Sequence, residues 1–67
     1  MNNIGKKIKE LRLENKLSQT KLAERLNVSQ DTISLWERDI SLPSADYIIK
    51  LCKIFEISAD CLLGIDD

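Results

Sequence analysis

Apolar residues recur along this chain at the spacing expected of amphipathic helices. Ile4, Ile8 and Leu11 lie at i, i+4 and i+7, which predicts a helix over residues 3–15. The apolar residues at helical spacing in the rest of the chain are Leu22, Ala23, Leu26, Ile33, Trp36, Ile48, Leu51, Cys52, Phe55, Leu62 and Leu63. Serine is a preferred N-cap residue, and the serines that precede the later helices are Ser18, Ser29, Ser44 and Ser58. The pattern therefore predicts an all-α chain of five short helices.

The second and third predicted helices lie within residues 18–38 and are joined by about three residues. Asn27 tolerates the left-handed conformation that a tight turn between helices needs. Ala23 is small enough to let another helix approach, and Val28 can fill the angle between the two helices after the turn. This pattern is typical of a helix-turn-helix, although any compact helical bundle can also contain an alanine and a short turn.

The predicted helix over residues 29–38 has two faces of different kinds. Its inward residues are Val28, Ile33 and Trp36. The residues on its other face, at i, i+3, i+4 and i+7, are Asp31, Ser34, Leu35 and Arg38. The first face is typical of a core, so the second face is free to contact something outside the domain.

Composition limits the classes of protein that this chain can represent. Sixty-seven residues make one small domain, residues 1–67, and two glycines and one proline suit a helical fold. Two cysteines without any histidine are too few for a disulfide framework or a zinc site, so we expect reduced, packed thiols at Cys52 and Cys61 and no metal or cofactor. The lack of histidine, of a glycine-rich phosphate loop and of paired acids argues against an enzyme and against a small-molecule pocket.

Short apolar runs and an uneven charge distribution suggest where the chain acts. No apolar run exceeds three residues, and the first residues lack a signal-peptide core, so we expect a cytoplasmic protein with no membrane contact. Residues 1–25 carry seven basic and three acidic side chains, whereas residues 26–67 carry three basic and eight acidic ones. The basic half suits an anionic partner, although ordinary solvated lysines on a surface helix explain it equally well.

Longer motifs in the chain resemble those of one known family. The stretch LSQTKLAERLNVSQDTISLWERD is similar to the helix-turn-helix of the phage repressor/Cro family, also called the XRE family. The resemblance continues through IKELRLENKLSQ, LPSADYIIKLCKIFEIS and SADCLLG, which look like the family's first, fourth and fifth helices. It implies a compact five-helix, repressor-like domain of a bacterial or phage transcriptional regulator that binds double-stranded DNA. Such a regulator is associated with the nucleoid when it is bound to DNA.

In such domains the third helix lies in the major groove with its outer face toward the bases. The positions that the resemblance places near base edges are Gln30, Asp31, Thr32, Ser34 and Leu35. Glutamine can pair bidentately with adenine, the hydroxyl groups can serve either kind of base, and leucine can rest on a thymine methyl group. Asp31 has a second interpretation, because an acid in a first helical turn also complements the helix dipole.

Phosphate contacts and one ion pair are also implied. The positions that match the family's backbone contacts or offer helix-start N–H groups are Ser18, Gln19, Ser29, Arg38 and Ser44. The resemblance pairs Arg12 with Glu37 between the first and third helices, a structural role that suits the rigid fork of arginine.

The chain departs from the family pattern at several positions. Members often have glycine where this chain has Lys16, Asn27 and Asp39, and arginine where it has Leu35. The loop over residues 39–42, commonly basic in relatives, is here acidic and apolar, which predicts fewer phosphate contacts and a shallower salt dependence. Four apolar residues look surplus to a small core and suit either peripheral packing or a partner surface: Ile40, Leu42, Tyr47 and Ile54.

Relatives commonly dimerise near the fifth helix, so a homodimer on a palindromic operator is expected. The corresponding residues here are Ala59, Asp60, Cys61 and Ile65. An alternative is an antitoxin-like or partner-binding module on the same scaffold, which the acidic second half and the apolar loop favour.

Overall fold

The computed structural model describes residues 4–64. Five helices follow one another along the chain: α1 (Ile4–Glu14), α2 (Gln19–Leu26), α3 (Gln30–Glu37), α4 (Ala45–Phe55) and α5 (Ala59–Leu63). Within residues 4–64 all regular structure is helical, which confirms the predicted all-α, five-helix fold. None of these helices is long and apolar enough to cross a membrane.

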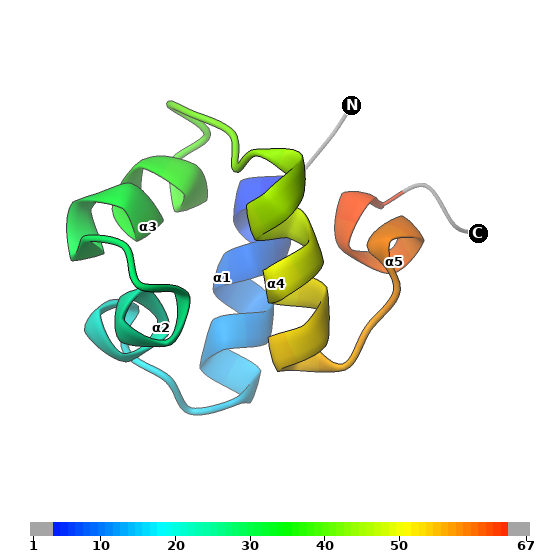
Figure 1. The fold of residues 1–67 in the computed structure, drawn as a ribbon, viewed down its shortest axis with the longest axis horizontal. Helices are drawn as coiled ribbons and strands as arrows, with labels where there is room; N and C mark the ends of the chain where they lie inside the picture. Colours follow the sequence, from blue (N-terminus) through cyan, green and yellow to red (C-terminus); the bar gives the residue numbers. More distant parts are fainter. Residues whose placement is uncertain (1–3, 65–67) are drawn as a thin grey trace.

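The long helices α1 and α4 form the centre of the molecule, with α2 and α3 on one side and α5 on the other (Figure 1). Helix α1 packs against both α3 and α5, while α4 contacts α5 and α2. The helix-turn-helix unit is therefore supported from behind by the rest of the domain, and α5 lies away from α3.

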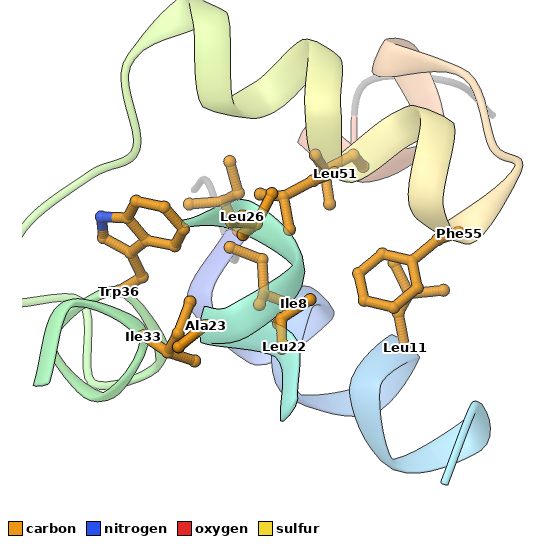
Figure 2. Packing of buried hydrophobic residues seen from close by; sticks show 11 residues of the cluster. Ile8, Leu11, Leu22, Ala23, Leu26, Ile33, Trp36, Leu51 and Phe55 are labelled. Carbon is orange, nitrogen blue, oxygen red and sulfur yellow. The ribbon is translucent and has the colours of Figure 1, made fainter. Parts of the chain in front are cut away.

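The predicted apolar positions meet in one core between the helices (Figure 2). Ile8, Leu22, Ile33, Leu51 and Leu62 have no exposed surface at all. The other buried members are Ile4, Leu11, Ala23, Leu26, Trp36 and Phe55. Burial of this apolar surface is the main favourable contribution to folding, at roughly 25 cal/mol per Å². Ile48, Cys52 and Leu63, which are also apolar residues at helical spacing, are only partly buried and pack against the cluster.

Three of the four predicted serine caps make the expected hydrogen bond. The Oγ atoms of Ser18, Ser29 and Ser58 each accept from the backbone N–H three residues later, over 3.0, 3.2 and 3.0 Å. Ser44 also precedes its helix with the same extended backbone, but its side chain makes no cap hydrogen bond. Ser44 is therefore the N-cap residue of α4, as predicted, but without the side-chain bond; because Ser44 is exposed, water can satisfy the first N–H groups of α4.

Four helices end on a residue other than glycine in the left-handed conformation: Lys16, Asn27, Asp39 and Glu56. In each case the N–H of the next residue, always apolar, bonds a carbonyl five residues earlier, as in Leu17 to Arg12 and Ile40 to Leu35, both at 3.0 Å. These are Schellman-type ends, in which an apolar residue after the turn accompanies the hydrogen bond. Ile40, which looked surplus in the sequence, occupies this position at the end of α3 although its side chain is 62% exposed.

Candidate nucleic-acid interface

Helix α3 is held by one face only. Ile33 and Trp36 point into the core, with 0% and 3% of their surfaces exposed (Figure 2). On the other face Asp31 and Arg38 are exposed, while Leu35 is half-buried. The two faces predicted from the sequence are therefore present, and the outer face carries a mixture of hydrogen-bonding groups and one aliphatic side chain.

The angle between α2 and α3 is fixed at a small residue and a short turn. Ala23 of α2 is 3% exposed and belongs to the core, so α2 can pack closely there. The N–H of Val28 donates to the carbonyl of Ala23 over 3.0 Å, and the Val28 side chain packs against the core. Asn27 ends α2 in the left-handed conformation, at φ 59°, and Ser29 caps α3 two residues later.

An ion pair joins α1 to the end of α3, at the two residues that the family resemblance pairs. The Arg12 guanidinium donates to both carboxylate oxygens of Glu37, at 2.6 Å from Nε and 3.1 Å from the second terminal nitrogen. Its remaining terminal nitrogen donates to the carbonyl of Leu17 over 2.9 Å. The two side chains are only 9% and 4% exposed, so water screens the pair weakly. The arrangement ties α3 to α1 through a bidentate contact.

A chain of side-chain amides continues from this ion pair to the start of α3. Gln19 Nε2 donates to Glu37 Oε1 over 3.0 Å, and Gln30 Nε2 donates to Gln19 Oε1. The first residues of α2 and α3, Gln19 and Gln30, are thus in contact with each other. Gln19 is hydrogen-bonded to the buried carboxylate directly, and Gln30 is connected to it through Gln19. We call the set Arg12, Glu37, Gln19 and Gln30 the polar relay.

The C-terminal end of α3 is also attached to α1. Asp39 Oδ1 accepts from the backbone N–H of Gly5 over 3.2 Å, which satisfies one of the free N–H groups in the first turn of α1. A Cβ atom on Gly5 would lie 2.3 Å from the carbonyl oxygen of Trp36 and 2.6 Å from Asp39 Oδ1. Glycine is therefore needed for this approach, a requirement that no local sequence pattern indicates.

The remaining predicted interface residues are arranged in local pairs. The Ser29 hydroxyl bonds both the N–H and the hydroxyl of Thr32, and Arg38 Nε donates to the Ser34 side chain over 3.2 Å. Bonds made through Nε leave the terminal nitrogens of Arg38 for other acceptors. Ser18 is exposed at the start of α2. This places candidate phosphate donors at the starts of α2 and α3 and at the end of α3.

Helix α5 carries the residues expected at a dimer contact. Ala59 and Asp60 are exposed and Cys61 is half-buried, whereas Ile65 lies outside the described residues. Partial burial raises the pKa of the Cys52 thiol, and the nearby Cys61 raises it further. Both cysteines are free, and residues 4–64 bring together no group of three metal-ligating side chains.

These observations define a helix-turn-helix domain: two short helices joined by a tight turn, the second presenting its outer face and anchored at both ends. The chain belongs to the helix-turn-helix family, since the family model HTH_3: Helix-turn-helix matches residues 8–60. The family inferred from sequence motifs is thus confirmed.

Several relatives carry the same domain. The HTH-type transcriptional regulator ImmR of Bacillus subtilis (strain 168) is 38% identical over 64 residues, which cover 96% of this chain and 50% of ImmR. The HTH-type transcriptional activator BcrR of Enterococcus faecalis is 36% identical over 60 residues, covering 90% of this chain and 29% of BcrR. The chain thus spans half the length of ImmR and less of BcrR.

One solved structure has nearly the same fold. It is the P22 c2 repressor protein in complex with synthetic operator 9T in the presence of Tl+, with a TM-score of 0.88 and 32% sequence identity. The match covers 98% of this chain and 100% of that one. The P22 c2 repressor, in a crystal structure with operator DNA, therefore has nearly the same helical arrangement as this chain.

Proposed function

We propose that this chain is the DNA-binding domain of a sequence-specific transcriptional regulator, a repressor, that reads the major groove with the outer face of α3. The observation that carries the proposal is the rigid mounting of α3. Its inner face is buried at Ile33 and Trp36, while Glu37 and Asp39 anchor its C-terminal end to α1. A helix held in this way projects one face without bending, as groove recognition requires. The likeness to an operator-bound repressor supports the same conclusion.

Base reading is assigned to the exposed and half-buried polar residues of α3. Gln30, Thr32 and Ser34 supply donors and acceptors, and half-buried Leu35 supplies an apolar contact for a thymine methyl group. Asp31 is exposed in the first turn, where its carboxylate complements the helix dipole and can also accept from cytosine N4.

Phosphate contacts are assigned to the starts of α2 and α3 and to the end of α3. Backbone N–H groups beside Ser18, Gln19 and Ser29 carry partial positive charge, and exposed Arg38 adds a full charge. Ser44 offers a further set of N–H groups at the start of α4, free of any side-chain cap. Residues 39–44, between Arg38 and α4, contribute no basic side chain, so we expect a modest dependence of affinity on salt.

Two further parts of the proposal concern assembly and location. A homodimer that meets through Ala59, Asp60 and Cys61 of α5 would leave both α3 helices free, because α5 lies across the molecule from α3 (Figure 1). Such a dimer would read a palindromic site whose halves are separated by about one turn of DNA. The protein would act in the cytoplasm, on the nucleoid. A partner-binding module remains the alternative, with exposed Ile40 and Leu42 as its contact surface, but regulator relatives favour DNA.

The test is selection from a random duplex library at one fixed, near-physiological salt concentration. Wild-type protein should enrich a palindromic sequence, and the double variant Gln30→Ala, Ser34→Ala should lose that enrichment. Lys53→Gln, an exposed change on α4, serves as the control and should select the wild-type sequence. Failure of the wild type to enrich any sequence, with variant and control alike, would contradict the proposal.

A further inference from the structure

The hydrogen bonds of the polar relay run in one direction, from donor to acceptor toward Glu37, and the buried Glu37 carboxylate fixes that direction. Glu37 is bound to the Arg12 guanidinium as a carboxylate, and a carboxylate accepts hydrogen bonds without donating any. The Gln19 atom that faces Glu37 Oε1 must therefore be the amide nitrogen, as observed at 3.0 Å. This fixes the Gln19 carbonyl oxygen on the opposite side, toward Gln30.

The same logic fixes the amide of Gln30. Because Gln19 presents an acceptor, the Gln30 atom in contact with it must be the nitrogen, as observed. One N–H of Gln30 is used in this bond. The groups left for a ligand are the second N–H and the carbonyl oxygen, which are one donor and one acceptor side by side.

One donor beside one acceptor matches adenine and does not match guanine. In the major groove adenine offers the N7 acceptor and the N6 amino donor, whereas guanine offers two acceptors, N7 and O6. A glutamine whose amide was turned over would present both N–H groups and would suit guanine instead. The relay therefore decides which purine Gln30 can bind with two hydrogen bonds.

We infer that Glu37 is a positioning residue for base choice: through Gln19 it holds Gln30 in the orientation that selects adenine. Turning both amides over would set the carbonyl oxygen of Gln19 against a carboxylate that is 4% exposed, so that two acceptors would face each other with little water between them. The buried ion pair thus has a second role beyond attaching α3 to α1. This inference rests on the proposed reading of DNA by α3.

Glu37→Gln is the substitution that reverses the relay without removing it. The new amide has only one acceptor side, and the shorter Arg12 contact, from Nε at 2.6 Å, places the new amide oxygen at the Oε2 position. The new amide nitrogen then lies at the Oε1 position, where it gives up the 3.1 Å bond from the second terminal nitrogen of Arg12 and faces Gln19. Gln19 then turns its oxygen toward this donor and its nitrogen toward Gln30. Gln30 in turn presents both N–H groups to the groove.

Library selection should be repeated with four proteins: wild type, Gln30→Ala, Glu37→Gln and Gln19→Met. Gln30→Ala identifies the base pair that Gln30 reads, and the wild type should prefer adenine over guanine there by roughly tenfold or more, the worth of one bidentate contact. Glu37→Gln should reduce this ratio by about tenfold or invert it. Gln19→Met, which frees Gln30 to turn, should bring the ratio close to one. Fluorescence of Trp36, which is 3% exposed, verifies that each variant is folded.

The outcomes separate this inference from the proposed function. Lack of any enriched sequence for the wild type contradicts the proposed function. An enriched operator in which Gln30→Ala changes no position, or in which the wild type prefers guanine there, overturns the relay while the proposed function stands. An adenine preference that survives in both Glu37→Gln and Gln19→Met also overturns it. If Glu37→Gln does not fold, Gln19→Met decides, since a retained preference refutes the relay and a relaxed one supports it.

Discussion

Replacing Arg12 by methionine would leave the Glu37 carboxylate charged and without its guanidinium partner. The Glu37 side chain is only 4% exposed, and its remaining donor would be Gln19 Nε2. Breaking a buried pair in this way typically costs roughly 3–5 kcal/mol, because an uncompensated charge stays out of water. A domain of 67 residues has a total stability of about 3–10 kcal/mol, so the variant should be severely destabilised.

Glu37→Met should have a similar but somewhat smaller effect, since Arg12 would keep its bond to the Leu17 carbonyl at 2.9 Å. The double variant Arg12→Met, Glu37→Met removes both charges and fills the site with apolar groups of similar length. It should be more stable than the sum of the single changes predicts by about 1–3 kcal/mol.

The assay is urea unfolding followed by the fluorescence of the single tryptophan, Trp36, which is buried in the native state. All four proteins of the cycle are measured at low temperature and one pH, where the least stable variant still shows a folded baseline. A cost below about 1 kcal/mol for Arg12→Met, the value of an exposed surface pair, would refute the reasoning. Additive effects within about 0.3 kcal/mol would refute it as well.

Three further changes test local features of the fold by the same unfolding measurement. Gly5→Ala should destabilise by about 1–3 kcal/mol despite the helix propensity of alanine, because the new Cβ would lie 2.3 Å from the Trp36 carbonyl oxygen; a stabilised variant would contradict this close approach. Lys16→Gly should raise the free energy of unfolding by up to about 1 kcal/mol, because Lys16 adopts a left-handed φ of 58° that glycine adopts without strain. An unchanged or lower urea midpoint would contradict backbone strain at this residue. Ser58→Ala should cost about 1 kcal/mol and Ser44→Ala clearly less, because only the Ser58 side chain caps its helix; equal losses would show that the cap bonds do not explain the difference.

Local sequence signals were sufficient for the helices and most of the core. Serine caps and apolar spacing depend on residues three or four apart, so they are readable without coordinates. They placed α2 between Ser18 and Asn27, as observed. They also placed Ser44 at the N-cap of α4, as observed, but the position alone does not show whether the side chain makes the cap bond, because that bond depends on the rotamer as well.

Contacts between residues far apart in the sequence could be predicted only where the family resemblance implied them. The Arg12–Glu37 pair was implied in that way and is present. The bond from Gly5 to Asp39 joins residues 34 apart, and no local pattern predicts it. It also explains why aspartate can occupy a left-handed position that suits glycine, because its carboxylate bonds the first turn of α1 and so offsets the strain at φ 58°.

The candidate site was predicted as a set of positions but without its internal connections. Gln19 and Gln30 were expected to contact phosphate and base separately, whereas their side chains contact each other and lead to Glu37. This link depends on the angle between α2 and α3, which the turn at Asn27 fixes and which sequence spacing alone does not give.

The central claim, that the outer face of α3 reads a specific DNA sequence, is tested most directly by a ratio of affinities. Binding of the wild type and of the Gln30→Ala, Ser34→Ala variant is measured at one salt concentration, on the selected operator and on a scrambled duplex of equal length. The wild type should bind its operator about 10³-fold or more tightly than the scrambled duplex. The variant should lose at least about tenfold of that ratio while its affinity for the scrambled duplex stays the same, because phosphate contacts remain. A wild-type ratio near one, or a ratio that the variant leaves unchanged, would contradict the account.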